Sequence, residues 1–329
     1  MIFRNLVGND DFKKEISYMF ENGRLPHAII IEGETGLGKL TAARDIARAL
    51  VCKSETQEKA CGECPACKKA AAGSHPDIFE FVSKLTPRSF PVDKVREIKN
   101  DAHIMPNEAD CKVYILGNAS SMGREAQNAL LKTLEEPPKN VFIIMTAVSK
   151  TMFLETVLSR ARAFKLNALS RQQVYEYLHE NFSDADEQTL AKSADICCGN
   201  IGKACDSLTD GKLALYSDTT LSVCKALLEG DEYAVLTALA PLDANRDMVR
   251  GVMQFCANFF RDALVLSSGL DSDNCNDVVK SMGNRFSKKS LLSLISFVQT
   301  AEDMVNKNIN NNLLITKICF GMRDALNGG

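Results

Sequence analysis

The sequence predicts an α/β fold with a parallel sheet in the first half of the chain and an all-helical second half. In residues 1–167, short apolar runs alternate with helical patterns, which is typical of a parallel sheet covered by helices. Beyond residue 166 the strand-like runs stop, and apolar residues recur at helical spacing. A length of 329 residues also favours two or three domains.

The first half contains five candidate strands and three clear helical patterns between them. The helix expected over Arg124–Glu135 ends before Pro137-Pro138, because proline cannot continue a helix. The other two helices are expected over Leu40–Val51 and Val92–Ala102. The expected strands are Ala28–Glu32, Ile78–Val82, Val113–Leu116, Val141–Thr146 and Ala163–Leu166.

The second half is expected to form two helical domains, over residues 168–210 and 211–329. Ser170 and Gln173 have the spacing of a capping box, which predicts a helix start, and further helices are expected after Ser183 and near Asn200. Polar stretches near Ser267–Asn276 and Asn306–Asn312 interrupt the last domain. Its helices carry apolar residues that suit packing, such as Leu313, Leu314, Ile318 and Met322.

Composition limits the possible functions. A net charge of −3 disfavours a protein that grips DNA alone, so any DNA contact is expected to be local or shared with other chains. The N-terminus lacks the pattern of a secretory signal, and no uncharged apolar run reaches the roughly 18 residues that would span a bilayer. We therefore expect a soluble, cytoplasmic protein.

A phosphate-binding loop follows the first expected strand. The segment Gly33-Glu34-Thr35-Gly36-Leu37-Gly38-Lys39 fits the Gly-x4-Gly-Lys pattern at the start of a helix. In such loops the glycines let backbone N–H groups surround phosphates, and the lysine reaches the outer phosphates. Gly33, Gly36, Gly38 and Lys39 are thus candidate nucleotide-binding residues.

The same site lacks the residues that hold magnesium. Leu40 stands where a Ser or Thr hydroxyl should bind Mg²⁺, and Thr41 lies about 100° further round the helix. Gly117 and Asn118 stand where an acidic pair should end the strand Val113–Leu116. Thr41 is kept with the glycines and Lys39 as part of a degenerate nucleotide site. We expect ATP or ADP to bind weakly or not at all, and no hydrolysis by this chain.

Four of the twelve cysteines form a Cys-x8-Cys-x2-Cys-x2-Cys cluster: Cys52, Cys61, Cys64 and Cys67. Two-residue spacings let thiolates converge on one ion, and four thiolates give the closed shell of structural Zn²⁺. Free thiols, a redox pair and an iron–sulfur cluster are the alternatives. His75 is a possible substitute ligand, although His75-Pro76 is better explained as the turn into the next strand.

Together these motifs resemble the AAA+ ATPase module of bacterial DNA polymerase III clamp loaders. The run Ala126–Pro138 (AQNALLKTLEEPP) is similar to one signature of that family, and Thr156–Arg162 (TVLSRAR) is similar to its Ser-Arg-Cys motif with Ala161 in place of cysteine. The resemblance is specific over about the first 210 residues. It implies an AAA+ domain with a zinc knuckle at residues 52–67, a helical lid and a helical collar.

Two kinds of subunit in this family share these features. The gamma/tau kind is a working ATPase with a complete site, whereas the delta-prime kind tends to have a defective one. Leu40, Gly117 and Asn118 therefore favour the delta-prime kind. The alternatives are an active gamma/tau-type ATPase, in which Glu125 could supply a missing carboxylate, and a zinc-stabilised scaffold outside replication.

The resemblance also implies roles and partners. Arg160 matches the arginine that contacts ATP bound by a neighbouring subunit, or else it pairs with a carboxylate at the edge of the sheet. Arg162 is expected to be structural. Lys203 matches a basic residue of the lid that senses the nucleotide, so it is assigned to the degenerate nucleotide site, although it equally suits a solvated helix start. Thr146 matches a polar sensor at a strand tip.

The implied partners are gamma/tau and delta subunits, with the sliding clamp and primed DNA reached through the assembly. The isolated chain should be a monomer without ATPase activity, and it would count as part of the polymerase holoenzyme. No membrane partner is expected.

Overall fold

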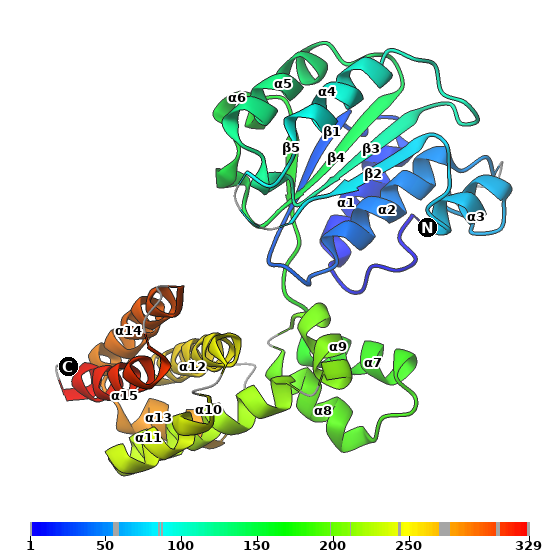
Figure 1. The fold of residues 1–329 in the computed structure, drawn as a ribbon. Coiled ribbons are helices and arrows are strands. Elements are labelled where there is room, and N and C mark those ends of the chain that lie inside the picture. The colour runs from blue at the N-terminus through cyan, green and yellow to red at the C-terminus, as the bar shows by residue number, and fades with distance from the viewer. Residues whose placement is uncertain are drawn as a thin grey trace. The chain divides into compact units, whose positions relative to one another are not determined.

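The computed structural model describes residues 2–54, 59–84, 86, 88–197, 199–210, 212–242, 245–269, 277–306 and 310–327 (Figure 1). The chain divides into two compact units. The first comprises Met1–Leu169 with Asn200–Gly202, and the second comprises Ser170–Gly199 with Lys203–Gly329.

The first unit is a five-stranded parallel sheet with the strand order β2-β3-β4-β1-β5. The strands are β1 (Ala28–Glu32), β2 (Ile78–Val82), β3 (Lys112–Gly117), β4 (Val141–Ala147) and β5 (Arg162–Lys165). The predicted parallel sheet is confirmed, and the strand limits differ from the expected ones by at most one residue. Such accuracy is possible because these runs are apolar and bounded by polar or turn residues.

Helices cover both faces of the sheet (Figure 1). Alternate residues of a strand point to opposite faces, so Ile29 and Ile31 face one layer and Ala28 and Ile30 the other. The first layer contains α1 (Asp10–Glu21), α2 (Lys39–Val51) and α3 (Pro65–Ala71). The second contains α4 (Val92–Asp101), α5 (Arg124–Glu135) and α6 (Glu155–Leu158).

This topology positions the candidate site. In a parallel sheet all strands end at the same edge, and ligands bind beyond those carboxyl ends. The phosphate loop follows β1, and the position expected for the acidic pair follows β3.

The second unit is helical over its described residues. Its capping box is present: the Ser170 hydroxyl accepts from the Gln173 N–H, and the Gln173 side chain accepts from the Ser170 N–H. Among the helices of the described residues, none combines the length and apolar character needed to cross a bilayer. The helices are α7 (Arg171–Asn181), α8 (Glu187–Ile196), α9 (Ile201–Asp210), α10 (Lys212–Glu229), α11 (Glu232–Leu239), α12 (Arg246–Ser267), α13 (Asp277–Arg285), α14 (Lys288–Asn306) and α15 (Asn311–Asn327).

A single large apolar core joins α10 to α15. Leu314, Ile318 and Met322 lie in it as expected, whereas Leu313 is half exposed. Of the two polar breaks expected in this region, residues 270–276 and 307–309 lie outside the described part of the chain.

Candidate functional sites: phosphate loop, cysteine cluster and arginine segment

The phosphate loop has the backbone of a nucleotide-binding loop. Gly33, Gly36 and Gly38 all have positive φ, in the range that favours glycine, and Gly38 is the N-cap of α2. A β-carbon at Gly33 would lie 2.9 Å from the Leu166 carbonyl oxygen, so this position also requires glycine. The loop therefore keeps the shape that its sequence predicts.

The lysine of the loop is turned toward the loop itself. The Lys39 ammonium donates to the carbonyl oxygens of Gly33 at 2.7 Å and Glu34 at 2.5 Å. Its side chain is only 7% exposed. Burial lowers the pKa of Lys39 to about 8, because removing the ammonium from water disfavours its charge, although the nearby Glu34 carboxylate acts in the opposite direction.

The segment that precedes the predicted sensor Lys203 contacts the loop directly, through residues that the sequence analysis did not single out. The Asn200 amide donates to the Thr35 carbonyl at 2.7 Å, and the Gly202 N–H donates to the Gly36 carbonyl at 2.9 Å. A β-carbon on Gly36 would lie 2.2 Å from the Asn200 side-chain oxygen. Asn200 is buried, so two residues far away in the sequence satisfy two carbonyl groups of the loop.

Leu40 and Thr41 occupy the first turn of α2. Leu40 is partly buried and packs against the apolar core between the sheet and α1 and α2. Its side chain thus adds to the core, and it has no hydroxyl for a metal ion. Thr41 is partly buried in the same turn. Its inclusion in the nucleotide site stays a prediction.

The position of the acidic pair is filled by residues with structural roles. A β-carbon on Gly117 would lie 2.8 Å from a Val82 methyl group, so a larger side chain requires Val82 to move. Asn118 has positive φ; its N–H donates to the Thr146 hydroxyl at 3.0 Å and its side-chain amide to the Ser83 carbonyl at 2.6 Å. Asn118 and Thr146 therefore join the ends of β3 and β4.

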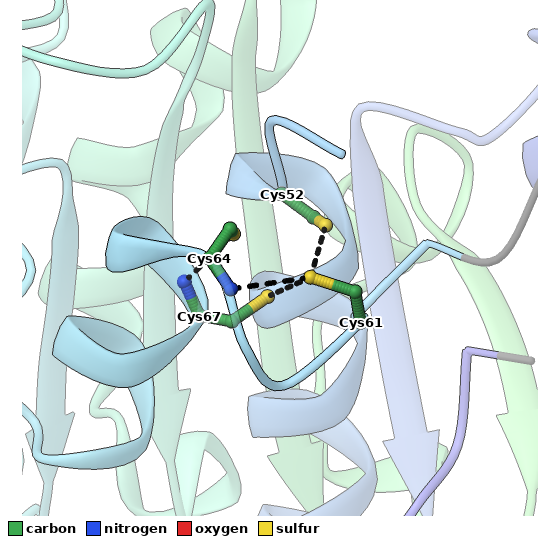
Figure 2. A group of neighbouring side chains, drawn as sticks. All are labelled: Cys52, Cys61, Cys64 and Cys67. Atoms are coloured by element: carbon green, nitrogen blue, oxygen red, sulfur yellow. Dashed lines mark hydrogen bonds between the residues drawn. The ribbon is translucent and has the colours of Figure 1, made fainter. Parts of the chain in front are cut away.

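The four cysteines predicted to bind a metal come together, as Figure 2 shows. Their sulfur atoms all lie within 4.8 Å of one another, with Cys61 at 3.7 Å from Cys52 and 3.9 Å from Cys67. Four thiolates around one Zn²⁺ at about 2.3 Å would place the sulfurs about 3.8 Å apart. The cluster could therefore hold a metal ion of this size.

Local backbone geometry shapes the cluster. The N–H of Cys64 donates to the Cys61 sulfur and the N–H of Cys67 to the Cys64 sulfur, both at 3.4 Å. These turns use positive φ at Gly62 and the proline that opens α3. Backbone N–H groups of Cys64 and Glu63 lower the pKa of Cys61 to about 6, whereas burial raises the pKa of Cys67.

His75 is not part of the cluster formed by the described residues. It is buried, its Nδ1 accepts from the Asp77 N–H at 3.1 Å, and its carbonyl accepts from the Ile78 N–H. It therefore forms the turn into β2, as the sequence suggested.

The N-terminal segment links the cysteine cluster to α2. The Arg4 guanidinium donates to the Cys61 carbonyl. A β-carbon on Gly62 would lie 2.6 Å from a terminal nitrogen of this guanidinium. The N–H groups of Arg4 and Asn5 donate to the fully buried Asp45 carboxylate of α2. No pattern in the sequence predicts these contacts.

Arg160 lies in the short segment between α6 and β5. Its guanidinium donates to the Thr156 carbonyl at 2.8 Å and to the Ser159 hydroxyl at 2.9 Å. It also forms an ion pair with Glu135, the last residue of α5, at 3.0 Å. The alternative to the finger role was a carboxylate at the edge of the sheet, whereas the observed partner, Glu135, ends a helix. The side chain is still 34% exposed.

The two runs that resemble the clamp-loader signatures contact each other here. Gln127 is buried in α5; it accepts from the Leu154 N–H at 2.7 Å and donates to the carbonyls of Met122 and Met152. Because Leu154 is the N-cap of α6, Gln127 fixes the start of this helix. Glu135 pairs with Arg160, two residues after the end of α6. Helix α5 thus supports the Arg160 segment at two points.

The other candidate residues have separate surroundings. Arg162 pairs with Glu15 at 2.6 Å and lies over the Phe164 ring, which agrees with a structural role. Glu125 is exposed and pairs with Arg96 at 3.2 Å. Lys203 belongs to the second unit, in the first turn of α9, and its assignment to the nucleotide site stays a prediction.

Comparison with known proteins identifies the family. A family model described as DNA polymerase III, delta subunit, matches residues 8–170. The DNA polymerase III subunit delta' of Escherichia coli is 27% identical over 332 residues, which cover 97% of this chain and 95% of that protein. The chain belongs to the clamp-loader family.

Within this family, the relatives that match are named as subunits of DNA polymerase III. Relatives of both kinds match, since the subunit gamma of Buchnera aphidicola is 31% identical over 210 residues, covering 63% of this chain. The chain spans about 57% of the length of that gamma subunit. A DNA polymerase III gamma subunit-related protein of Thermotoga maritima has a similar structure, with a TM-score of 0.45, 18% identity, and coverage of 94% of this chain and 99% of that one.

Proposed function

We propose that this clamp-loader subunit is of the delta-prime kind, does not hydrolyse ATP itself and supplies Arg160 to the ATP site of a neighbouring subunit. The observation that carries the proposal is the state of its own site. The places of the magnesium hydroxyl and of the acidic pair are taken by Leu40, Gly117 and Asn118, and each of these is built into the packing around it.

The chemistry of ATP hydrolysis explains why this loss matters. Magnesium neutralises charge on the phosphates, and a carboxylate or amide orients the attacking water. The Lys39 ammonium is buried and already bonds to two loop carbonyls. Because Leu40 has no hydroxyl for Mg²⁺ and Gly117 and Asn118 have no carboxylate, the site lacks the groups that accelerate phosphoryl transfer at the positions where they are needed.

Arg160 retains chemistry that a neighbour can use. A guanidinium from an adjacent chain stabilises the charge that develops on the transferred phosphoryl group, which is the role of an arginine finger. Arg160 is partly exposed and lies outside this chain's own loop, in the segment after α6. In this proposal the chain contributes to catalysis only through its neighbour's site.

We propose that the cysteine cluster holds a structural Zn²⁺. The sulfur separations fit a tetrahedral thiolate shell, and four protein ligands leave no open position for a substrate. Replacing Cys67 with serine should reduce the zinc content of the purified chain from about one ion per chain to near zero. Retention of one zinc ion by this variant would contradict the assignment of Cys67 as a ligand.

We further propose that the helical second unit serves as lid and collar, over residues 168–210 and 211–329. The partners would be gamma/tau and delta subunits, and the sliding clamp and primed DNA would be reached through the assembly. Relatives named as gamma and delta' subunits support this proposal. The isolated chain would be a monomer.

The competing proposal is an active ATPase of the gamma/tau type. The matches to gamma and tau subunits favour this alternative. Magnesium-dependent ATP turnover by the isolated chain separates the two. We expect no turnover above background, and the same background in a Lys39→Ala variant. Turnover that disappears in Lys39→Ala would show an active site in this chain and would overturn the proposed function.

A further inference from the structure

We propose that Glu135 is a positioning residue for Arg160, acting as the counter-ion that fixes its guanidinium for use by the neighbouring subunit. This inference rests on the proposed function of Arg160. It assigns a role to a residue that the nucleotide site does not explain.

The contacts of Arg160 leave its side chain few alternatives. One terminal nitrogen donates to both Thr156 and Ser159, within the same short segment. The other terminal nitrogen faces Glu135, which comes from a different helix. Thus the local hydrogen bonds hold one side of the guanidinium, and among the described residues only Glu135 ties the other side to the body of the first unit.

The location of Glu135 suits a counter-ion. It is the last residue of α5, where the partial negative charge of the helix end already disfavours a carboxylate. A cation beside Glu135 offsets the negative charge of the carboxylate and the partial negative charge of the helix end, so Arg160 is attracted to this point. The helix ends at Glu135 because Pro137 and Pro138 follow, which fixes the carboxylate in space.

The pair is not explained by stability alone. Both side chains are partly exposed, at 34% and 47%, and exposed ion pairs contribute little to folding. Catalytic groups, in contrast, lose much of their effect when they are misplaced by about 1 Å.

Arg160 keeps a donor for phosphate while it pairs with Glu135. Arginine has five N–H donors, and the Nε of Arg160 is in no hydrogen bond within the described part of the chain. The guanidinium can therefore be oriented by Glu135 and still bind phosphate.

The test is ATP hydrolysis by a loader reconstituted with gamma/tau and delta subunits, stimulated by the sliding clamp and primed DNA. We expect Glu135→Ala to lower kcat about threefold to tenfold with KM for ATP unchanged, and Glu135→Gln to have a smaller effect because its oxygen still accepts from Arg160. The matched control is Glu136→Ala, which removes the same charge one residue later. Glu136 makes no ion pair within the described residues.

The decisive comparison combines both changes. In an Arg160→Ala background, Glu135→Ala should have no further effect, because the positioning residue then has nothing to position. An equal loss in both backgrounds would overturn the proposal and show a merely structural role. An increase in hydrolysis in Glu135→Ala would also overturn it, since Glu135 would then restrain Arg160.

The outcomes separate this inference from the proposed function. If Arg160→Ala leaves hydrolysis unchanged, the role of Arg160 in the neighbour's site is wrong. If Arg160→Ala lowers hydrolysis and both Glu135 variants match the wild type, only the role of Glu135 is wrong. Gel filtration of each assembly and circular dichroism of each chain control for folding, and Glu135→Gln supplies the result if Glu135→Ala does not fold.

Discussion

The phosphate loop and the arginine segment belong to the same unit but differ in what they retain. The loop keeps its glycines and lysine, yet Lys39 bonds to loop carbonyls and Gly117 stands against Val82 where a carboxylate is needed. The arginine segment keeps its arginine, with Gln127 and Glu135 of α5 as supports. A subunit can thus lose the catalytic groups of its own nucleotide site and still keep an arginine positioned for the ATP site of a neighbouring subunit.

The largest expected effect comes from restoring an acidic residue at the end of β3. Gly117→Asp should reduce the free energy of unfolding of the first unit by about 3 kcal/mol, because its β-carbon would meet Val82 and its carboxylate would be buried. Urea denaturation measures this. The control is Gly123→Ala, whose β-carbon would lie 3.6 Å from Arg88, with an expected cost below about 1 kcal/mol. Equal stability of Gly117→Asp and the wild type would show that the site can still accept a carboxylate.

An intermediate effect is expected where the arginine segment is anchored. Gln127→Ala should lower the free energy of unfolding by about 2 kcal/mol, since the buried Gln127 side chain is lost and the Leu154 N–H and the carbonyls of Met122 and Met152 lose their partner. The same variant should lower hydrolysis by the assembled loader, because α6 carries the Arg160 segment. Normal stability and normal hydrolysis in Gln127→Ala would mean that α6 is positioned by other contacts.

The smallest expected effect is a pH dependence that arises in the loop. The pKa of Lys39 is lowered to about 8 in the folded chain, so between about pH 8 and 10.5 the unfolded state binds more protons than the folded state. The contribution of Lys39 to stability therefore becomes more favourable as the pH rises through this window, on the order of 1 kcal/mol. Denaturation of the wild type and Lys39→Met at pH 7.5 and 10 measures it. An identical pH dependence of the two proteins would contradict the burial of this ammonium.

Much of the fold could be predicted from the sequence because local signals were strong. The strands of the sheet are short apolar runs between turn residues, and the Cys52–Cys67 cluster has spacings that bring thiols together. The capping box at Ser170 is also a local pattern. The three losses at the nucleotide site could be seen because a motif fixes which residue types it needs.

The rest depends on contacts between residues far apart in the sequence. No local pattern shows that Asn200 bonds to Thr35, that Arg4 reaches Cys61, or that Gly117 abuts Val82. The pairing of Arg160 with a carboxylate could be named as an alternative, but Glu135 could not be chosen among the acidic residues. The pairing of Arg160 with Glu135 follows from the packing of α5 against α6, which local sequence patterns do not encode.

The central claim is that this chain acts through Arg160 and not through its own loop. The direct test is clamp- and DNA-stimulated ATP hydrolysis by the reconstituted loader with Arg160→Ala, Lys39→Ala or Arg162→Ala in this chain. We predict a loss of about tenfold or more for Arg160→Ala, and values within about twofold of the wild type for the other two. A loss in Lys39→Ala with normal hydrolysis in Arg160→Ala would contradict the account and would assign an active ATP site to this chain.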